Sequence, residues 1–422
     1  MTQRATRTAI LALAVTAVVG TATVPAAHAS AVPAGSGTRS AAMAPAHDRA
    51  AGHAATLTAL RQVVEAGRLP GVAAEVRHGK EQWFASAGFA DTATGRRRSA
   101  GEHFRAASIT KPFLATVLLQ LEEEGRLSLA DTVEKWLPGV VRGNGNDGRK
   151  VTLRSLLNHT SGLYNHTEDE AFRRNASGIG FLEHRYDTHT PEELVALAMT
   201  RSPKPDPEEE PPYYSNTNFV LAGMVVEKVT GRSYAQEVTR RVIKPLRLRG
   251  TSFPGTSPWM PAPHPVGYST LNDKTPGAPV HDATEQNMTW LSAAGDMIST
   301  LGDINRFHRA LLKGELLSRP QVAKMLDAVP TGDGPGYGLG VETVELSCGK
   351  TVVGKTGRTN GSLSAVAGTV DGDHQLTFNI NGDWLPDPSV YTNVIEAEFC
   401  GRIPAREGRP GVTSASAGGV GR

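Results

Sequence analysis

The 422-residue sequence has little excess charge, few cysteines and no long apolar run, and each shortage excludes a class of protein. Forty-four basic and 42 acidic side chains leave a formal charge of +2, so no global field favours nucleic acid or an anionic membrane. The two cysteines lack zinc-ligand spacing and the histidines include no HExxH motif, so we predict no metal. The segment 143–148 fits GxGxxG but lacks the flanking strand and helix of a dinucleotide site. We interpret it as a surface turn and predict no cofactor.

The first 29 residues are typical of an export signal. Arg4 and Arg7 provide a positive start, twelve apolar residues follow at 9–20, and Ala27-His28-Ala29 matches a small-x-small cleavage site. A membrane anchor is the alternative, but this run is shorter than the roughly 18 apolar residues that a membrane-spanning helix needs. We therefore expect a signal peptide at 1–29 and a secreted protein without a stable membrane anchor.

Composition divides the remaining chain into one large domain with two flanking segments. Residues 30–53 are rich in Ala, Gly, Pro and Ser and predict a flexible linker, and residues 401–422 predict a flexible tail of the same kind. The domain between them spans residues 54–400, and we expect it to be a monomer. Because export permits disulfides, Cys348 and Cys400 are expected to bond to each other.

Hydrophobic periodicity places strands near both ends of this domain and helices between them. Strand patterns at 71–76 and 82–89 follow an amphipathic helix at 57–64, and strand patterns return at 351–354, 363–370 and 375–380. Helical patterns begin near Ser108 and recur at 153–157, 191–199, 218–229, 234–242 and 304–312. These patterns predict an α/β fold in which both chain ends build one sheet and a mostly α-helical region is inserted.

A Ser-x-x-Lys motif occurs twice, and the context distinguishes the two copies. Ser108-Ile109-Thr110-Lys111 opens an apolar helical pattern, where residues i and i+3 share a face and the lysine amine can reach the serine hydroxyl. The other copy, Ser347-Cys348-Gly349-Lys350, lies in a strand-turn context. A helix-capping serine is the alternative for Ser108, but a cap does not explain a lysine among apolar neighbours. Burial lowers a lysine pKa, and a neutral amine can take the serine proton.

Two further motifs follow in a fixed order: Tyr214-Ser215-Asn216 opens a predicted helix, and Lys355-Thr356-Gly357 ends a predicted strand. Together with Ser108-x-x-Lys111, they make the chain resemble the serine hydrolases of the penicillin-binding protein and class C β-lactamase family. The stretches 104–111, 156–162 and 292–296 extend the resemblance over roughly residues 57–400. Within the family, the segments 337–340, 346–348 and 398–401 are similar to secreted D-alanyl-D-alanine carboxypeptidases, which have a disulfide at matching places. The resemblance implies a β-lactamase/transpeptidase-like fold with an antiparallel sheet.

The resemblance also implies a mechanism. Ser108 would attack the carbonyl between two D-alanines and form an acyl-enzyme, while Lys111 and Tyr214 pass the proton to the leaving amine. Lys355 would raise the local positive potential and favour the deprotonated form of Lys111 or Tyr214. Among the expected substrate contacts, Asn216 orients Lys111 and the substrate amide, and Thr356 with Lys355 holds a substrate carboxylate. Gly357 belongs to the same motif, and the backbone amides of Ser108 and Arg358 bind the oxyanion. Trp290 is either a wall of the cleft or an ordinary core residue.

Two features depart from the carboxypeptidase pattern. Glu342 lies near the place where those enzymes have an arginine that helps to receive the terminal carboxylate, and a glutamate repels such a group. Arg358 is the candidate to bind the carboxylate from the other side. The stretch 203–212 contains three consecutive glutamates, Glu208–Glu210, and is either a surface loop or a segment over the cleft that disfavours anionic substrates.

These residues predict a penicillin-sensitive DD-carboxypeptidase that acts on D-Ala-D-Ala peptides. The expected partners are peptidoglycan stem peptides or related D-amino-acid peptides, with β-lactams as inhibitors or substrates. A class C-like β-lactamase or a small-ester hydrolase with the same residues is the alternative among enzymes. A noncatalytic β-lactam or peptidoglycan binder is the alternative of another class, and the intact set of Ser108, Lys111, Tyr214 and Lys355 argues against it.

Overall fold

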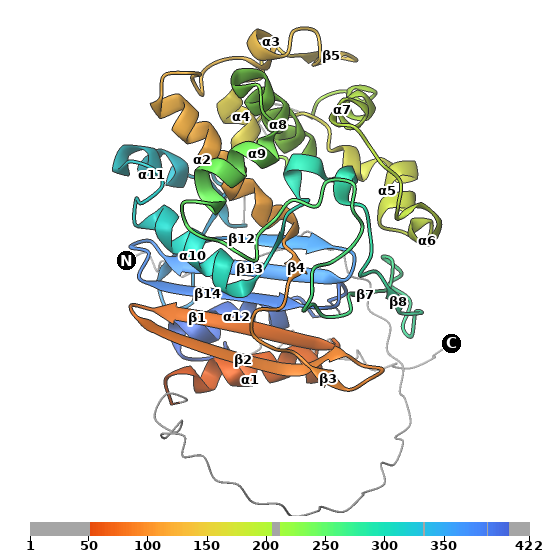
Figure 1. Ribbon diagram of the computed structural model, residues 1–422, viewed down its shortest axis with the longest axis vertical. Coiled ribbons are helices and arrows are strands. Elements are labelled where there is room, and N and C mark those ends of the chain that lie inside the picture. The colour runs from red at the N-terminus through yellow and green to blue at the C-terminus, as the bar shows by residue number, and fades with distance from the viewer. Residues whose placement is uncertain (1–50, 205–211, 332–333, 386, 405–422) are drawn as a thin grey trace, which may run out of the picture.

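The computed structural model describes residues 51–404 apart from 205–211, 332–333 and 386 (Figure 1). The predicted signal peptide, most of the predicted linker and tail, and Glu208–Glu210 lie outside the described residues. The last three residues assigned to the linker form a 3-10 helix, η1 (Ala51–His53), that continues into α1 (Ala54–Glu65). Within the described ranges no helix is long and apolar enough to cross a membrane.

An eight-stranded antiparallel sheet joins the two ends of the domain, as the sequence predicts. Its order is β10-β11-β12-β13-β14-β1-β2-β3, so the first strand of the chain pairs with the last. The bounds are β1 (Gly71–His78), β2 (Glu81–Asp91), β3 (Arg96–Arg97), β10 (Gly336–Tyr337), β11 (Glu342–Glu345), β12 (Thr351–Thr359), β13 (Ser362–Thr369) and β14 (His374–Ile380). The helical region is inserted between β3 and β10.

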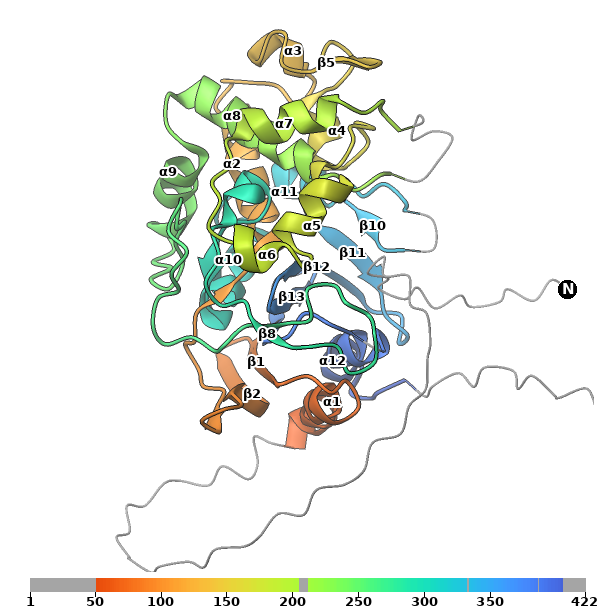
Figure 2. The same ribbon diagram turned by 90° about the vertical axis from the view of Figure 1, so that its right-hand side faces the viewer.

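Helices cover both faces of this sheet. Side chains alternate between the two faces along each strand, so apolar residues on either face need a layer that buries them. On one face α1 and α12 (Ser389–Cys400) pack over an apolar cluster that includes Val72 and Phe378. On the other face α2 (Thr110–Glu123), α8 (Asn216–Thr230) and α10 (Leu301–Leu312) belong to a larger core that includes Val353 and Val366. Figure 2 shows α1 and α12 next to each other at one side of the sheet and the helical region at the other side.

Shorter elements complete the helical region. The helices are α3 (Val133–Trp136), α4 (Leu153–Leu157), α5 (Glu170–Ala176), α6 (Phe181–His184), α7 (Pro191–Met199), α9 (Tyr234–Val238) and α11 (Arg319–Leu326). The two-stranded ribbons are β4 (Phe104–Arg105) with β9 (Ile298–Ser299), β5 (Arg142–Gly143) with β6 (Asn146–Asp147), and β7 (Tyr268–Ser269) with β8 (His281–Asp282). The GxGxxG segment therefore forms the β5–β6 turn, as expected. The helix predicted at 234–242 divides into α9 and a π-helical turn at 239–243.

Cys348 and Cys400 form the predicted disulfide, with their Cα atoms 5.8 Å apart. The bond closes a loop of 52 residues between the β11–β12 turn and the end of α12. In the chain-entropy account, this restriction of the unfolded chain contributes about 4 kcal/mol to stability. The second Ser-x-x-Lys copy belongs to the same junction, because Ser347 donates its hydroxyl to Glu396 on α12 at 2.7 Å. That copy is therefore a structural turn.

Candidate active site

Ser108 lies in a 3-10 turn, η2 (Ala107–Ile109), that leads directly into α2. The preceding residue, Ala107, has φ of 48°, in the left-handed region that residues with a Cβ atom seldom adopt. The Ser108 hydroxyl bonds to Lys111 and Tyr214 and caps neither helical segment. The helix-cap interpretation of Ser108 is therefore wrong.

Lys111 and Tyr214 meet at the Ser108 hydroxyl. Lys111 Nζ lies 3.0 Å and the Tyr214 hydroxyl 2.8 Å from Ser108 Oγ. Lys111 is completely buried, and its Nζ also donates to Asn216 Oδ1 and to the carbonyl of Ala294, both at 2.8 Å. Of the three groups bonded to this amine, only the Ser108 hydroxyl can give up a proton. The amine is thus positioned as the base for Ser108.

The surroundings shift the pKa values of these groups in opposite directions. Burial lowers the pKa of Lys111 well below its ordinary value, and the ammonium of Lys355 lowers it further. Burial raises the pKa of the Tyr214 phenol. A lysine with a low pKa can accept the serine proton, whereas a phenol with a high pKa keeps its own proton and can donate it. This arrangement is suited to general base and general acid catalysis around one nucleophile.

Lys355 is paired with a carboxylate. Its Nζ forms a short ion pair with Glu342 on the neighbouring strand, and the Thr356 hydroxyl lies 3.4 Å from both Glu342 oxygens. Burial opposes the charge on Lys355, but the Glu342 carboxylate, through charge and hydrogen bond, together with Tyr214 outweighs it and raises the pKa of Lys355. We expected Lys355 and Thr356 to hold a substrate carboxylate, whereas the structure places the Glu342 carboxylate against both of them.

Aromatic rings separate the two lysines. The ring centroid of Tyr214 lies 5.0 Å from Lys111 Nζ and 5.2 Å from Lys355 Nζ, and the ring of Tyr337 lies 5.4 Å from Lys355 Nζ. At these distances the ammonium of Lys355 is attracted by the faces of the Tyr214 and Tyr337 rings. Tyr337 pairs with Glu342 across β10 and β11, so the short strand β10 brings its ring into the site.

His159 packs behind Tyr214 and was not among the predicted site residues. The two rings lie 4.3 Å apart. Its Nδ1 lies 3.2 Å from the backbone nitrogen of Ser215 and 3.2 Å from Asn218 Nδ2. Both partners are donors, so Nδ1 is the acceptor and the proton is on Nε2. Burial lowers the pKa of His159 well below its ordinary value, so the imidazole ring is neutral and packs against Tyr214 in a fixed tautomer. The stretch 156–162 contains it, but local sequence does not reveal the contact.

The comparisons with known proteins agree with this geometry. A family model described as Beta-lactamase matches residues 57–389. The chain belongs to the beta-lactamase family of serine hydrolases. It is 28% identical over 270 residues to the putative penicillin-binding protein PbpX of Bacillus subtilis (strain 168). The matched region covers 64% of this chain and 61% of the relative. The chain therefore spans less than two thirds of that relative.

Two solved structures share the fold over almost their whole length. A D-stereospecific amidohydrolase from Streptomyces sp. is 51% identical, with a TM-score of 0.77, 83% of this chain covered and 99% of that chain. The D-amino acid amidase from Ochrobactrum anthropi SV3, solved with D-phenylalanine, is 26% identical, with a TM-score of 0.70 and the same coverage of 83% and 99%. The predicted β-lactamase/transpeptidase fold is thereby confirmed.

Gly357 allows the third motif of this beta-lactamase family hydrolase to approach the nucleophile. A Cβ atom at this position would lie 2.3 Å from the carbonyl oxygen of Ala106, a distance that no side chain tolerates. Only glycine lets β12 lie so close to η2. This contact brings the backbone of the strand beside the Ser108 turn, as an oxyanion hole formed by Ser108 and Arg358 amides requires. That pairing of amides stays a prediction.

Two predicted site residues of this serine hydrolase lie outside the Ser108 network. The Arg358 guanidinium donates to Asn272 Oδ1 at 3.2 Å, so it contacts a neighbouring loop, and its role as a second carboxylate receptor stays a prediction. Trp290 ends the 3-10 helix η5 (Met288–Trp290), and its carbonyl accepts from His166 Nε2 at 3.0 Å. The Trp290 side chain lines a cavity beside the site that contains none of the residues bonded to Ser108, so its role as a wall of the catalytic cleft stays a prediction.

Proposed function

We propose that this serine hydrolase cleaves amide bonds of D-amino-acid derivatives through an acyl-enzyme on Ser108, and that it prefers leaving groups without a carboxylate. The ion pair between Glu342 and Lys355 carries the proposal. A carboxylate on the leaving group would approach Glu342 at the two groups, Lys355 and Thr356, that have to bind it. A carboxamide meets no such repulsion. The two similar structures are named for hydrolysis of D-configured substrates, which supports this configuration.

The proposed chemistry follows the geometry at Ser108. Ser108 Oγ attacks the carbonyl carbon of the scissile amide while its proton passes to Lys111 Nζ, 3.0 Å away. The resulting oxyanion collapses, the carbon–nitrogen bond breaks, and the leaving nitrogen takes a proton through the Tyr214 hydroxyl. Water then attacks the ester on Ser108 and gives one proton back to the serine oxygen through the same groups. The products are the acid and the free amine.

DD-carboxypeptidase activity on D-Ala-D-Ala peptides is the second candidate. The disulfide between Cys348 and Cys400 favours it, because the carboxypeptidases that the sequence resembles have a bridge at matching places. In this case the substrate carboxylate has to displace Glu342 from Lys355. Both candidates use the same nucleophile, and penicillins acylate Ser108 in either case.

A matched pair of peptides distinguishes the two candidates. One peptide ends in D-Ala-D-Ala with a free carboxylate, and the other has the same sequence with a terminal carboxamide. We expect kcat/KM for the carboxamide to be about tenfold higher or more, which corresponds to ~1.4 kcal/mol. A preference for the free acid would support the carboxypeptidase. L-configured peptides of the same length are the control for stereospecificity.

Mass spectrometry of the intact protein tests the nucleophile. Incubation with penicillin should add one β-lactam mass to the wild-type protein and none to Ser108→Ala, which should also lose hydrolysis of both peptides. An adduct on the Ser108→Ala variant would show that another residue is acylated, and hydrolysis that survives the substitution would remove Ser108 from the mechanism.

We also infer that residues 1–29 direct export of the enzyme. The composition of this segment supports the inference. N-terminal sequencing of the protein from the culture medium of an expressing bacterium should begin at Ser30. Retention of the full-length chain inside the cells would contradict it.

A further inference from the structure

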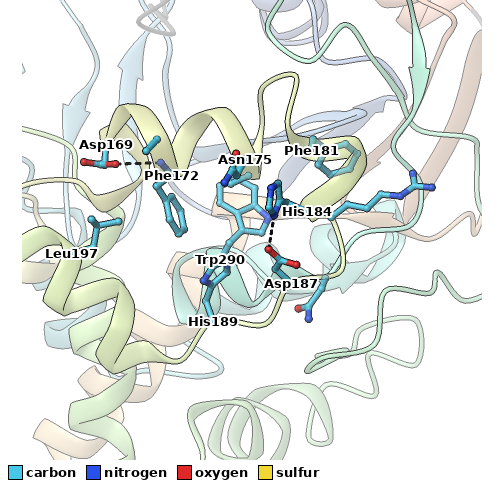
Figure 3. Close-up of a pocket in the computed structure, with 13 residues that line it drawn as sticks. Asp169, Phe172, Asn175, Phe181, His184, Asp187, His189, Leu197 and Trp290 are labelled. Carbon is cyan, nitrogen blue, oxygen red and sulfur yellow. Dashed lines mark hydrogen bonds and ion pairs between the residues drawn. The ribbon is translucent and has the colours of Figure 1, made fainter.

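A cavity of about 260 Å³ lies between helices of the inserted region and is separate from the residues that bond to Ser108 (Figure 3). Its walls come from α5, α6, α7 and η5. Aromatic and aliphatic groups dominate the lining: Ala171, Phe172, Ala176, Phe181, Leu197 and Trp290. Figure 3 shows Phe172, on α5, and Trp290 close together within this group. None of the residues that bond to Ser108 belongs to its lining.

Two backbone segments place the cavity next to the active site. Asn216, which bonds to Lys111, donates its Nδ2 to Thr167 Oγ1 at 3.2 Å, and two residues later Asp169 lines the cavity. Trp290 lines the cavity, and four residues later the carbonyl of Ala294 accepts from Lys111 Nζ at 2.8 Å. The same two segments therefore hold the base and form the cavity walls.

The edge of β12 indicates which part of a substrate points toward the cavity. Pairing between β11 and β12 ends at Glu342 and Gly354, whereas β12 pairs with β13 up to Thr359. The edge beyond Gly354 is therefore available to an extended substrate, which can add to it as a further strand. The next residue, Asn360, donates its Nδ2 to the carbonyl of Ala176, a cavity residue, at 2.9 Å. A substrate on this edge has Glu342 at one end and the cavity at the other.

The charged side chains around the cavity are bound to other protein groups. His184 Nδ1 and Asp187 Oδ2 lie 2.8 Å apart in a hydrogen bond drawn as a dashed line in Figure 3. The Asp169 carboxylate accepts from Arg201, just after α7, at 3.2 Å, and Arg185 donates to the carbonyl of Asp282 at 2.9 Å. With these charges engaged, the surface that remains for a ligand is mostly apolar, with the neutral amide of Asn175 and the ring of His189 as its polar parts. A charged group would enter without a partner, which is unfavourable.

We propose that this cavity binds an uncharged aromatic or branched aliphatic side chain on the acyl side of the scissile amide. The inference rests on the proposed function and names the substrate class for that same site. The volume of about 260 Å³ lies below the roughly 300–1,000 Å³ typical of pockets for whole small ligands, so it suits a single side chain. The enzyme should therefore prefer D-phenylalanine or D-leucine derivatives over D-alanine derivatives.

Two anilides that differ only in the acyl residue test the preference. D-phenylalanine and D-alanine p-nitroanilides have the same uncharged leaving group, so a difference in kcat/KM reports the acyl side. Burial of the larger side chain should raise kcat/KM roughly 10- to 100-fold over D-alanine. A ratio near one in the wild-type enzyme would overturn the proposal.

A variant that fills the cavity locates the preference. Leu197→Trp adds bulk to the cavity wall on α7, and Ala196→Trp introduces the same side chain at the exposed neighbouring position, which is outside the lining. We expect Leu197→Trp to lower the D-phenylalanine to D-alanine ratio about tenfold or more with little change in D-alanine turnover, and Ala196→Trp to leave the ratio unchanged. An unchanged ratio in Leu197→Trp, or an equal fall in both variants, would overturn the proposal.

A second variant keeps the inference testable if the filled cavity prevents folding. Phe172→Ala enlarges the cavity, so the preference should move from D-phenylalanine toward the larger D-tryptophan anilide; an unchanged order would overturn the proposal. Failure of the cavity inference and failure of the proposed function give different results. If only the inference fails, the anilides are cleaved without side-chain preference. If the proposed function fails, no D-anilide is cleaved, although penicillin still acylates Ser108.

Discussion

Replacing Glu342 by glutamine tests the electrostatic reasoning about the leaving group most directly. The substitution keeps the size of the side chain and removes one negative charge beside Lys355. In the wild-type enzyme the pair is close to neutral, so an incoming carboxylate gains little from Lys355. In Glu342→Gln the ammonium is no longer compensated and can attract that carboxylate.

The distances give the size of this change. Two unit charges 4 Å apart interact by about 4 kcal/mol at an effective dielectric constant of about 20. The Glu342 side chain keeps 12% of its exposure, so solvent screens the interaction, and we reduce the expected gain to about 1–2 kcal/mol. This corresponds to roughly a five- to thirtyfold increase in kcat/KM for the free acid relative to the carboxamide. Burial disfavours the charge on Lys355 once Glu342 is gone, so the gain should be larger at pH 6 than at pH 9.

The assay measures kcat/KM for the acid and carboxamide peptides between pH 6 and 9. Glu345→Gln is the matched control, because Glu345 lies on the same strand but is exposed and pairs with Thr351. Glu342 also raises the pKa of Lys111, so its removal should move the acid limb of the carboxamide profile to lower pH. If the ratio of acid to carboxamide stays the same in Glu342→Gln, or changes equally in both variants, Glu342 does not face the leaving group.

Three further predictions concern residues away from the leaving group. His159→Gln should lower kcat roughly 10- to 100-fold with little change in KM and slow penicillin acylation equally, because the Tyr214 ring loses its support; a change confined to KM would argue otherwise. Burial raises the pKa of Asp296 from 3.8 to about 7, so the folded protein loses stability relative to the unfolded chain as the pH rises from about 4 to 7 and Asp296 ionises in the unfolded chain first. In urea unfolding, the free energy of unfolding of Asp296→Asn minus that of wild type should increase over this window by up to about 4 kcal/mol. A difference that stays constant with pH would show that Asp296 does not titrate in this way. Replacing Cys348 and Cys400 together by alanine should lower the unfolding free energy by about 4 kcal/mol, and urea midpoints equal to wild type would contradict the chain-entropy account.

The central sheet was predictable because its strands have local signals. β1, β2, β12, β13 and β14 each contain a run of β-branched or alternating apolar residues bounded by turns, and each was placed within a few residues of its bounds. Lys355-Thr356-Gly357, predicted to end the strand that begins at Thr351, lies inside β12, which continues to Thr359. β10 and β11 were not predicted, since such short segments, of two and four residues, form strands only through pairing with neighbours: β11 with β12, and β10 with β11. α12 has apolar residues at helical spacing that we did not assign.

The identities of the catalytic residues could be predicted from the sequence, but the charge pairing around them could not. Ser108, Lys111 and Tyr214 belong to motifs whose order along the chain is informative by itself. The partner of Lys355 depends on the register of β11 against β12, in which Glu342 lies opposite Gly354. A one-residue change of register would turn the Glu342 side chain to the other face of the sheet. The position of Glu342 near the motif can therefore be predicted from the sequence, but its ion pair with Lys355 can be seen only in the folded structure.

The packing of α1 against α12 has a practical consequence for use of the enzyme. Ala51 precedes α1 and Pro404 follows α12, and both helices cover the face of the sheet opposite to the helical region that holds Ser108 (Figures 1 and 2). An enzyme attached to a resin through either flanking segment should therefore present its catalytic cleft to the bulk solution, with substrate entry unobstructed by the support.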